Sequence, residues 1–96
     1  MEKNTLEELY RLILERKEHT VEGSYTCSLF AQGKDKILKK FGEEAIEVII
    51  AAKGQGRQRI IEELSDLCYH TLVLMAREDI SPDDIYQELN GRSTKD

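Results

Sequence analysis

Apolar residues recur every three or four positions along most of this chain, which is the spacing of one face of an α-helix. The pattern predicts a first helix from about residue 5 to residue 16 and a short helical piece over residues 28–32. Two long helices follow over residues 34–53 and 57–77, and a last short helix begins after Ser81. No stretch alternates apolar and polar residues as a strand does, so the expected fold class is all-α.

Two of the helix starts carry further local signals. Thr5 followed by Glu8 fits a capping box, in which the hydroxyl and the carboxylate satisfy backbone N–H groups of the first turn. Ser81 fits an N-cap, with Pro82 at the first helical position and Asp84 at the third. These signals favour helices that begin at the same places as the apolar pattern.

The two long helices carry more apolar residues than a single stripe needs, and such helices are buried on more than one side. They are joined only by Gly54, Gln55 and Gly56, residues expected at a helix C-cap, so we expect them to pack as an antiparallel pair. A chain of 96 residues has a thin core, and small domains often oligomerise. We therefore expect one domain over residues 1–96, with a frayed tail at 93–96, that forms a helical bundle completed by homodimerisation.

Composition narrows the classes of partner. The formal net charge of −5 argues against a nucleic-acid binder, which normally has a basic face. No apolar run is long enough to span a membrane, and residues 1–4 lack the apolar core of a signal peptide. Cys27 and Cys68 are far apart in sequence and are interpreted as reduced structural thiols, which indicates a cytoplasmic protein.

Each long helix places carboxylates three or four residues apart inside an apolar run. Glu43 and Glu44 precede Glu47 in the first helix, and Glu63 precedes Asp66 in the second. On a helix these side chains share a face and repel, at a cost of a few tenths of a kcal/mol per pair. Mg²⁺, or Mn²⁺ in its place, prefers such oxygen ligands and would offset the repulsion. We expect Glu44, Glu47, Glu63 and Asp66 to hold one cation between the helices; the alternative is solvated surface charge.

Basic and hydroxyl side chains accompany the acids. Lys36 and Lys40 precede them on the same helix face, where an ammonium group suits a polyphosphate held by a metal. Ser24, Tyr25 and Thr26 place three hydroxyls in a predicted loop. They either contact a phosphate or ribose group, or form a turn and a helix cap.

His70 lies four residues after Asp66 on the same helix. It either binds the cation or orients a ligand, or it is a satisfied interface residue. Di-iron carboxylate bundles instead use Glu-x-x-His, a spacing of three, which weakens a di-iron interpretation.

Two segments together resemble a known family. Residues 39–48 read Lys-Lys-Phe-Gly-Glu-Glu-Ala-Ile-Glu-Val, and residues 63–70 read Glu-Leu-Ser-Asp-Leu-Cys-Tyr-His. They resemble the phosphoribosyl-ATP pyrophosphohydrolases, members of an all-α nucleotide pyrophosphohydrolase superfamily that includes the MazG proteins. The superfamily pattern is Glu-Glu-x-x-Glu, a spacer, and Glu-x-x-Asp. The resemblance spans about residues 5–92, and its departures, Phe41, Ser65 and Cys68, are not proposed ligands.

The resemblance implies Mg²⁺-dependent hydrolysis of 1-(5-phosphoribosyl)-ATP to 1-(5-phosphoribosyl)-AMP and pyrophosphate, the second step of histidine biosynthesis. In that reaction the four acids would hold the metal, and Glu43 would orient or deprotonate the attacking water. Lys36 and Lys40 would contact phosphates, and the three hydroxyl residues the phosphoribosyl or phosphate groups. The alternatives are a pyrophosphohydrolase of ordinary or damaged nucleoside triphosphates, a non-catalytic helical dimer, and an oxidative di-iron bundle. The sequence is compatible with a site built from one subunit or from two.

Overall fold

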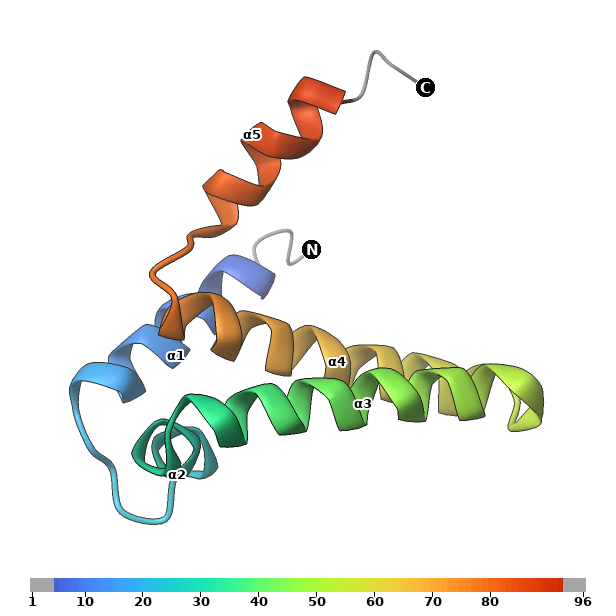
Figure 1. Cartoon of the computed structure of the whole chain (residues 1–96), viewed down its shortest axis with the longest axis horizontal. Coiled ribbons are helices and arrows are strands. Elements are labelled where there is room, and N and C mark those ends of the chain that lie inside the picture. The colour runs from blue at the N-terminus through green and yellow to red at the C-terminus, as the bar shows by residue number, and fades with distance from the viewer. Residues whose placement is uncertain (1–4, 93–96) are drawn as a thin grey trace.

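The computed structural model describes residues 5–92, and within that range it contains five α-helices and no strand (Figure 1). In chain order they are α1 (Thr5–Glu18), α2 (Tyr25–Gln32), α3 (Lys34–Gly54), α4 (Arg57–Arg77) and α5 (Pro82–Arg92). The all-α prediction is confirmed. The predicted tail at residues 93–96 lies outside the described residues. None of the described helices has the length and apolar character needed to cross a membrane.

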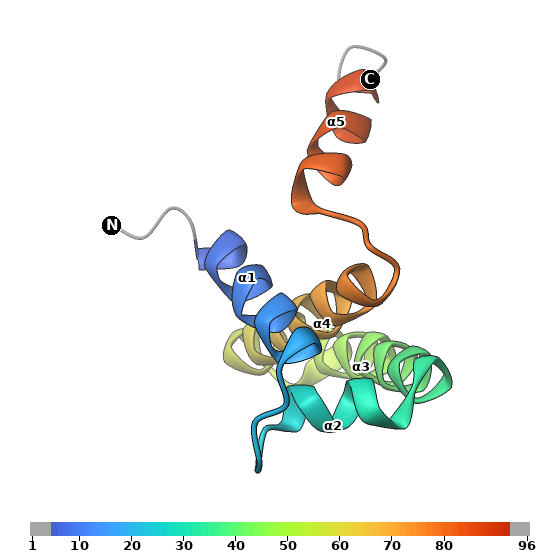
Figure 2. The same cartoon turned by 90° about the vertical axis from the view of Figure 1, so that its left-hand side faces the viewer.

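The long helices α3 and α4 lie side by side and antiparallel, as their short connection predicts (Figures 1 and 2). The three residues expected at the C-cap differ in conformation. Gly54 is still helical, and Gln55 follows it with its N–H donating to the carbonyl of Ala51 at 3.0 Å. Only Gly56 takes a positive φ, of 92°, a conformation that costs glycine little. One left-handed residue therefore suffices to reverse the chain.

Capping side chains determine where two of the shorter helices begin. The Ser24 hydroxyl accepts a hydrogen bond from the Cys27 N–H at 3.1 Å, so α2 starts three residues before the predicted Ser28. The turn-and-cap interpretation is thus confirmed for Ser24. At α5 the predicted N-cap at Ser81 forms, and the bonds are reciprocal: the Asp84 N–H donates to the Ser81 hydroxyl at 3.2 Å, and the Ser81 N–H donates to the Asp84 carboxylate at 2.9 Å.

The predicted cap at Thr5 is displaced. Thr5 already lies in the first turn of α1, and the residues before it lie outside the described residues. Helix ends commonly shift by one or two residues in this way. The same helix also runs two residues beyond the predicted end at Arg16, to Glu18.

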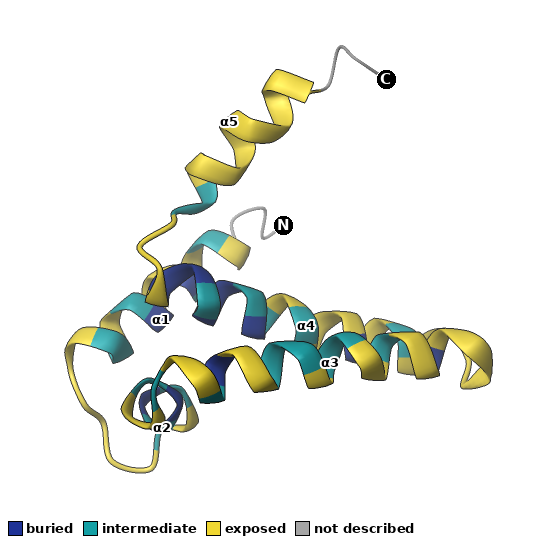
Figure 3. Cartoon of the chain, viewed as in Figure 1, coloured by how far each residue is buried: buried dark blue, intermediate teal, exposed yellow. Residues whose placement is uncertain are grey.

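The core lies at one end of the α3–α4 hairpin, where α1 and α2 pack against it (Figure 3). Each of these four helices contributes a fully buried side chain: Ile13, Leu29, Ile37 and Val73. Helix α5 contributes no buried residue and extends away from the other helices (Figure 2). Both cysteines are free; Cys27 is buried, whereas Cys68 is exposed on α4 and so is not a core residue of the single chain.

The other half of the hairpin has no cover within the described chain (Figure 3). Five large aliphatic side chains are exposed there, by between 41% and 60%: Ile46, Ile49, Ile50, Ile61 and Leu64. These five residues are called the apolar tip below. Leu64 lines a pocket together with Leu6 of α1, but all five side chains remain at least 41% exposed, so the second apolar side of the long helices faces outward in the single chain.

Leu29→Ala tests whether α2 is anchored through the core. Leu29 is fully buried, so removing its side chain is expected to lower the free energy of unfolding by about 2–5 kcal/mol. Urea denaturation at fixed protein concentration measures the change. Leu12→Ala is the matched control, because Leu12 is 46% exposed, and it should cost less than about 1 kcal/mol. Equal losses in the two variants would contradict the assigned core.

Candidate functional site

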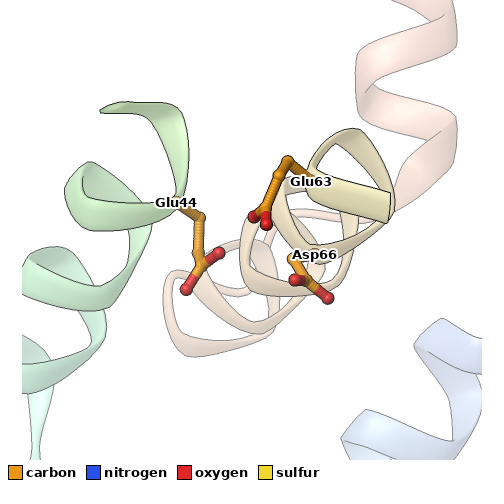
Figure 4. A group of neighbouring side chains, drawn as sticks. All are labelled: Glu44, Glu63 and Asp66. Carbon is orange, nitrogen blue, oxygen red and sulfur yellow. The ribbon is translucent and has the colours of Figure 1, made fainter. Parts of the chain in front are cut away.

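Three carboxylates from the hairpin converge near the middle of the two long helices (Figure 4). Glu44 comes from α3, and Glu63 and Asp66 come from α4; one carboxylate oxygen of each lies within 4.8 Å of the others. Glu44 and Asp66 are equally distant along the chain from Gln55, so antiparallel packing brings them to the same height. Of the acids that the sequence predicts as ligands, the structure brings these three together.

The three carboxylates differ in exposure. Glu63 is only 6% exposed, Glu44 is half-buried and Asp66 is exposed. A buried carboxylate is costly unless a positive group compensates it. The set therefore has a protein-enclosed side at Glu63 and an open side at Asp66. This donor set fits a hard divalent cation, which takes carboxylate oxygens from the protein and further oxygens from a substrate or water.

Lys40 lies on the Glu44 side of the group. Its ammonium nitrogen is 3.6 Å from a carboxylate oxygen of Glu44 and 3.5 Å from one of Glu43. Burial disfavours the charged form of Lys40, but Tyr25, Glu43 and Glu44 outweigh this effect and raise its pKa above the usual value. Lys40 is therefore an ammonium group at neutral pH, placed one helical turn before Glu44.

Arg59 lies on the Glu63 side and was not identified from the sequence. Its guanidinium forms ion pairs with both Glu62 and Glu63. It compensates the buried carboxylate of Glu63 from one turn earlier on α4. The signal that could have indicated it is the Arg-to-Glu spacing of four residues, which favours an ion pair on a helix.

Glu47 does not belong to the three-carboxylate group. It lies one turn beyond Glu44 on α3 and is exposed. Glu63 and Asp66 have the same spacing of three residues and both belong to the group, so the rotation of α3 against α4, and not the spacing, separates Glu47 from Glu44. Glu43 is also exposed and pairs with Lys40, and Lys36 is half-buried one turn before Lys40.

The hydroxyl residues at the start of α2 contact α4 directly after Asp66. The Tyr25 hydroxyl lies 3.2 Å from Nε2 of His70, and the hydroxyls of Thr26 and Tyr69 are hydrogen-bonded. The Tyr69 and His70 rings meet edge to face, with centroids 4.9 Å apart. The structure thus brings two of the three predicted hydroxyl side chains against the turn of α4 that follows Asp66. Tyr69, whose only sequence signal is its place next to His70, was missed.

The chain is similar to known proteins over almost its whole length. The family model described as phosphoribosyl-ATP pyrophosphohydrolase matches residues 6–93. A phosphoribosyl-ATP pyrophosphatase of Geotalea daltonii is 58% identical over 92 residues, which cover 96% of this chain and 87% of that protein. One of Sulfolobus acidocaldarius is 47% identical over 95 residues, or 99% of this chain and 100% of that protein.

A larger relative contains a similar segment. The histidine biosynthesis bifunctional protein of Oceanobacillus iheyensis is 58% identical over 80 residues, which cover 83% of this chain and 37% of that protein. The resemblance found in the two acidic segments is therefore confirmed over nearly the whole sequence. The chain belongs to the phosphoribosyl-ATP pyrophosphohydrolase family.

Proposed function

We propose that this chain hydrolyses 1-(5-phosphoribosyl)-ATP to 1-(5-phosphoribosyl)-AMP and pyrophosphate, as a step of histidine biosynthesis in the cytoplasm. Family membership supports the reaction. The observation that carries it is the convergence of Glu44, Glu63 and Asp66 beside the ammonium of Lys40. Acids that hold a cation, with a fixed positive side chain next to them, match the charge of a triphosphate.

Mg²⁺ is the proposed cofactor, and Mn²⁺ has the same ligand preference. Glu44, Glu63 and Asp66 would hold it, and Glu47 is the proposed fourth acid from the adjacent turn of α3. When bound, the ion would offset charge on the phosphate oxygens and lower the pKa of a bound water. Glu43 is the proposed residue that orients or deprotonates the attacking water, since it is exposed beside Glu44.

The remaining side chains are proposed to bind the substrate. Lys40, and Lys36 one turn earlier, would contact phosphate oxygens. Tyr25 and Thr26 would contact the phosphoribosyl part from the start of α2. Ser24, whose hydroxyl accepts the capping hydrogen bond from the Cys27 N–H, is the third hydroxyl residue proposed to contact this part of the substrate.

The assembly is proposed to be a homodimer of a single domain spanning residues 1–96. The apolar tip supports this, because five exposed aliphatic side chains on adjacent helices form a surface that is unfavourable in water. The proposed binding partner is a small nucleotide, and the net charge of −5 argues against a nucleic acid.

The activity is tested by incubating the purified chain with 1-(5-phosphoribosyl)-ATP and measuring pyrophosphate, with Mg²⁺ and with a chelator. Release only with Mg²⁺ supports the proposal. Turnover of 1-(5-phosphoribosyl)-ATP is then compared with turnover of a panel of deoxynucleoside triphosphates. A general triphosphate pyrophosphohydrolase would hydrolyse the deoxynucleoside triphosphates faster. No release from any nucleotide would instead indicate a non-catalytic dimer, and iron on purification would indicate a di-iron bundle.

Glu63→Gln is expected to reduce kcat/KM by more than about 100-fold, because loss of a direct metal ligand should exceed the 10–100-fold typical of groups that only support one. The matched control is Glu62→Gln. Glu62 also pairs with Arg59, but its side chain is 47% exposed and lies outside the three-carboxylate group. Steady-state pyrophosphate release measures both variants. If both variants lost kcat/KM equally, the loss would come from the broken ion pairs with Arg59 and not from a metal site.

Glu47→Gln decides whether a fourth acid serves the site. We expect turnover to be lost while the helical circular dichroism is retained, because Glu47 is exposed and its replacement leaves the core intact. Full activity in this variant would remove Glu47 from the metal ligands. Glu88→Gln, an exposed glutamate on α5, should keep both signals unchanged.

Ile49→Asp tests the apolar tip as the dimer contact. Ile49 is 60% exposed in the single chain, so the new charge costs little unless a second copy covers it. Light scattering should show a dimer for the unaltered chain and a monomer for the variant. Val21→Asp, at a residue that is 42% exposed in the loop before α2, should stay dimeric. A dimeric Ile49→Asp chain would move the interface elsewhere.

A further inference from the structure

His70 is a buried histidine with both ring nitrogens engaged, and its role is not explained by the metal site. It is 7% exposed. Its Nδ1 lies 2.9 Å from the backbone carbonyl oxygen of Asp66, and its Nε2 lies 3.2 Å from the hydroxyl of Tyr25. The ring therefore bridges the α4 backbone at a proposed metal ligand and the side chain at the start of α2.

The Asp66 carbonyl determines which nitrogen carries the proton. A carbonyl oxygen only accepts hydrogen bonds, so Nδ1 must be the N–H donor. A neutral imidazole has one N–H, which leaves Nε2 as an acceptor. The Tyr25 hydroxyl then donates its single proton to Nε2. What remains on the Tyr25 oxygen are lone pairs, which can only accept.

The rest of the cluster holds this arrangement in place. The Tyr69 ring packs edge to face on His70 at 4.9 Å between centroids, and Tyr25 stacks on Tyr69 at 6.2 Å. Tyr25 itself is 49% exposed, so its free side is accessible to a ligand. Tyr25 also contributes to the raised pKa of Lys40, which places its oxygen within electrostatic reach of the phosphate-binding side of the site.

We propose that His70 is a positioning residue that makes Tyr25 a hydrogen-bond acceptor in the substrate site, so that Tyr25 binds an O–H or N–H donor, such as a ribose hydroxyl, and not a phosphate oxygen. Phosphate oxygens are largely ionised at neutral pH and act mainly as hydrogen-bond acceptors. The phosphates therefore bind to Lys40 and to the cation held by the carboxylates. Tyr25 accepts a hydrogen bond from the sugar. This inference rests on the proposed function and refines the part of the substrate that Tyr25 contacts.

The tautomer can be tested without substrate. The chain has two histidines, and His19 is a surface residue whose side chain is 72% exposed, so His19→Gln leaves His70 as the single imidazole to observe. Nitrogen-15 NMR of that variant should show the Nδ1–H form of the neutral ring. Adding Tyr25→Phe should shift the Nε2 resonance, because its hydrogen-bond donor is gone. An Nε2–H ring would overturn the inference.

Kinetics test the consequence for binding. Tyr25→Phe and His70→Leu should each raise KM for 1-(5-phosphoribosyl)-ATP by about 3- to 10-fold, the effect of one neutral hydrogen bond, with kcat within about 2-fold. Inhibition by inorganic pyrophosphate, which has phosphates alone, should be unchanged. The double variant should match the single variants, because His70 acts through Tyr25. His70→Gln restores a hydrogen-bond acceptor for Tyr25, so its KM should lie between those of His70→Leu and the unaltered chain.

The controls separate this role from a structural one. Tyr86→Phe removes a hydroxyl that bonds Glu7 on the surface, and it should keep the KM of the unaltered chain. Additive losses in the double variant, or weaker pyrophosphate inhibition in Tyr25→Phe, would overturn the inference. If His70→Leu fails to fold, the KM and the pyrophosphate inhibition of Tyr25→Phe test the inference by themselves. Normal turnover with an unchanged KM in Tyr25→Phe overturns only this inference, whereas no pyrophosphate release by the unaltered chain overturns the proposed function as well.

Discussion

Antiparallel packing of α3 against α4 is the constraint on which the functional site depends. It sets Glu44 of one helix opposite Glu63 and Asp66 of the other, although like charges at this range repel (Figure 4). Apolar packing at one end of the hairpin holds the helices together, and Lys40 and Arg59 compensate two of the carboxylates. The free energy of packing in the core therefore offsets the repulsion between carboxylates that the two helices bring together.

The two halves of the hairpin differ in what covers them. At one end α1 and α2 bury the core around Leu29 and Val73, while the apolar tip at the other end is exposed within the described chain (Figure 3). The acids lie between these halves. Among the acids, Glu63 is buried and paired with Arg59, whereas Asp66 is exposed. A site at such a boundary combines a rigid support with access for a charged substrate.

Short polar contacts connect α2 to this site across a long sequence separation. Tyr25 and Thr26 bond to His70 and Tyr69, and His70 in turn bonds the Asp66 backbone. The side chains proposed to bind the sugar are thereby positioned relative to the acids by α4 itself. One helix, α4, therefore carries two proposed metal ligands together with the groups that orient a tyrosine proposed to bind the substrate.

The sequence by itself determined the helices, because their signals lie among near neighbours. Apolar spacing placed α4 at residues 57–77, Ser81 and Asp84 placed the start of α5, and the paired acids with their resemblance indicated the family. Only the tertiary structure decided that Glu44 and not Glu47 completes the three-carboxylate group, that Arg59 pairs with Glu63, and that Tyr25 meets His70. Those outcomes depend on how each helix is rotated about its axis against another, and that rotation is set by packing between residues far apart in the chain.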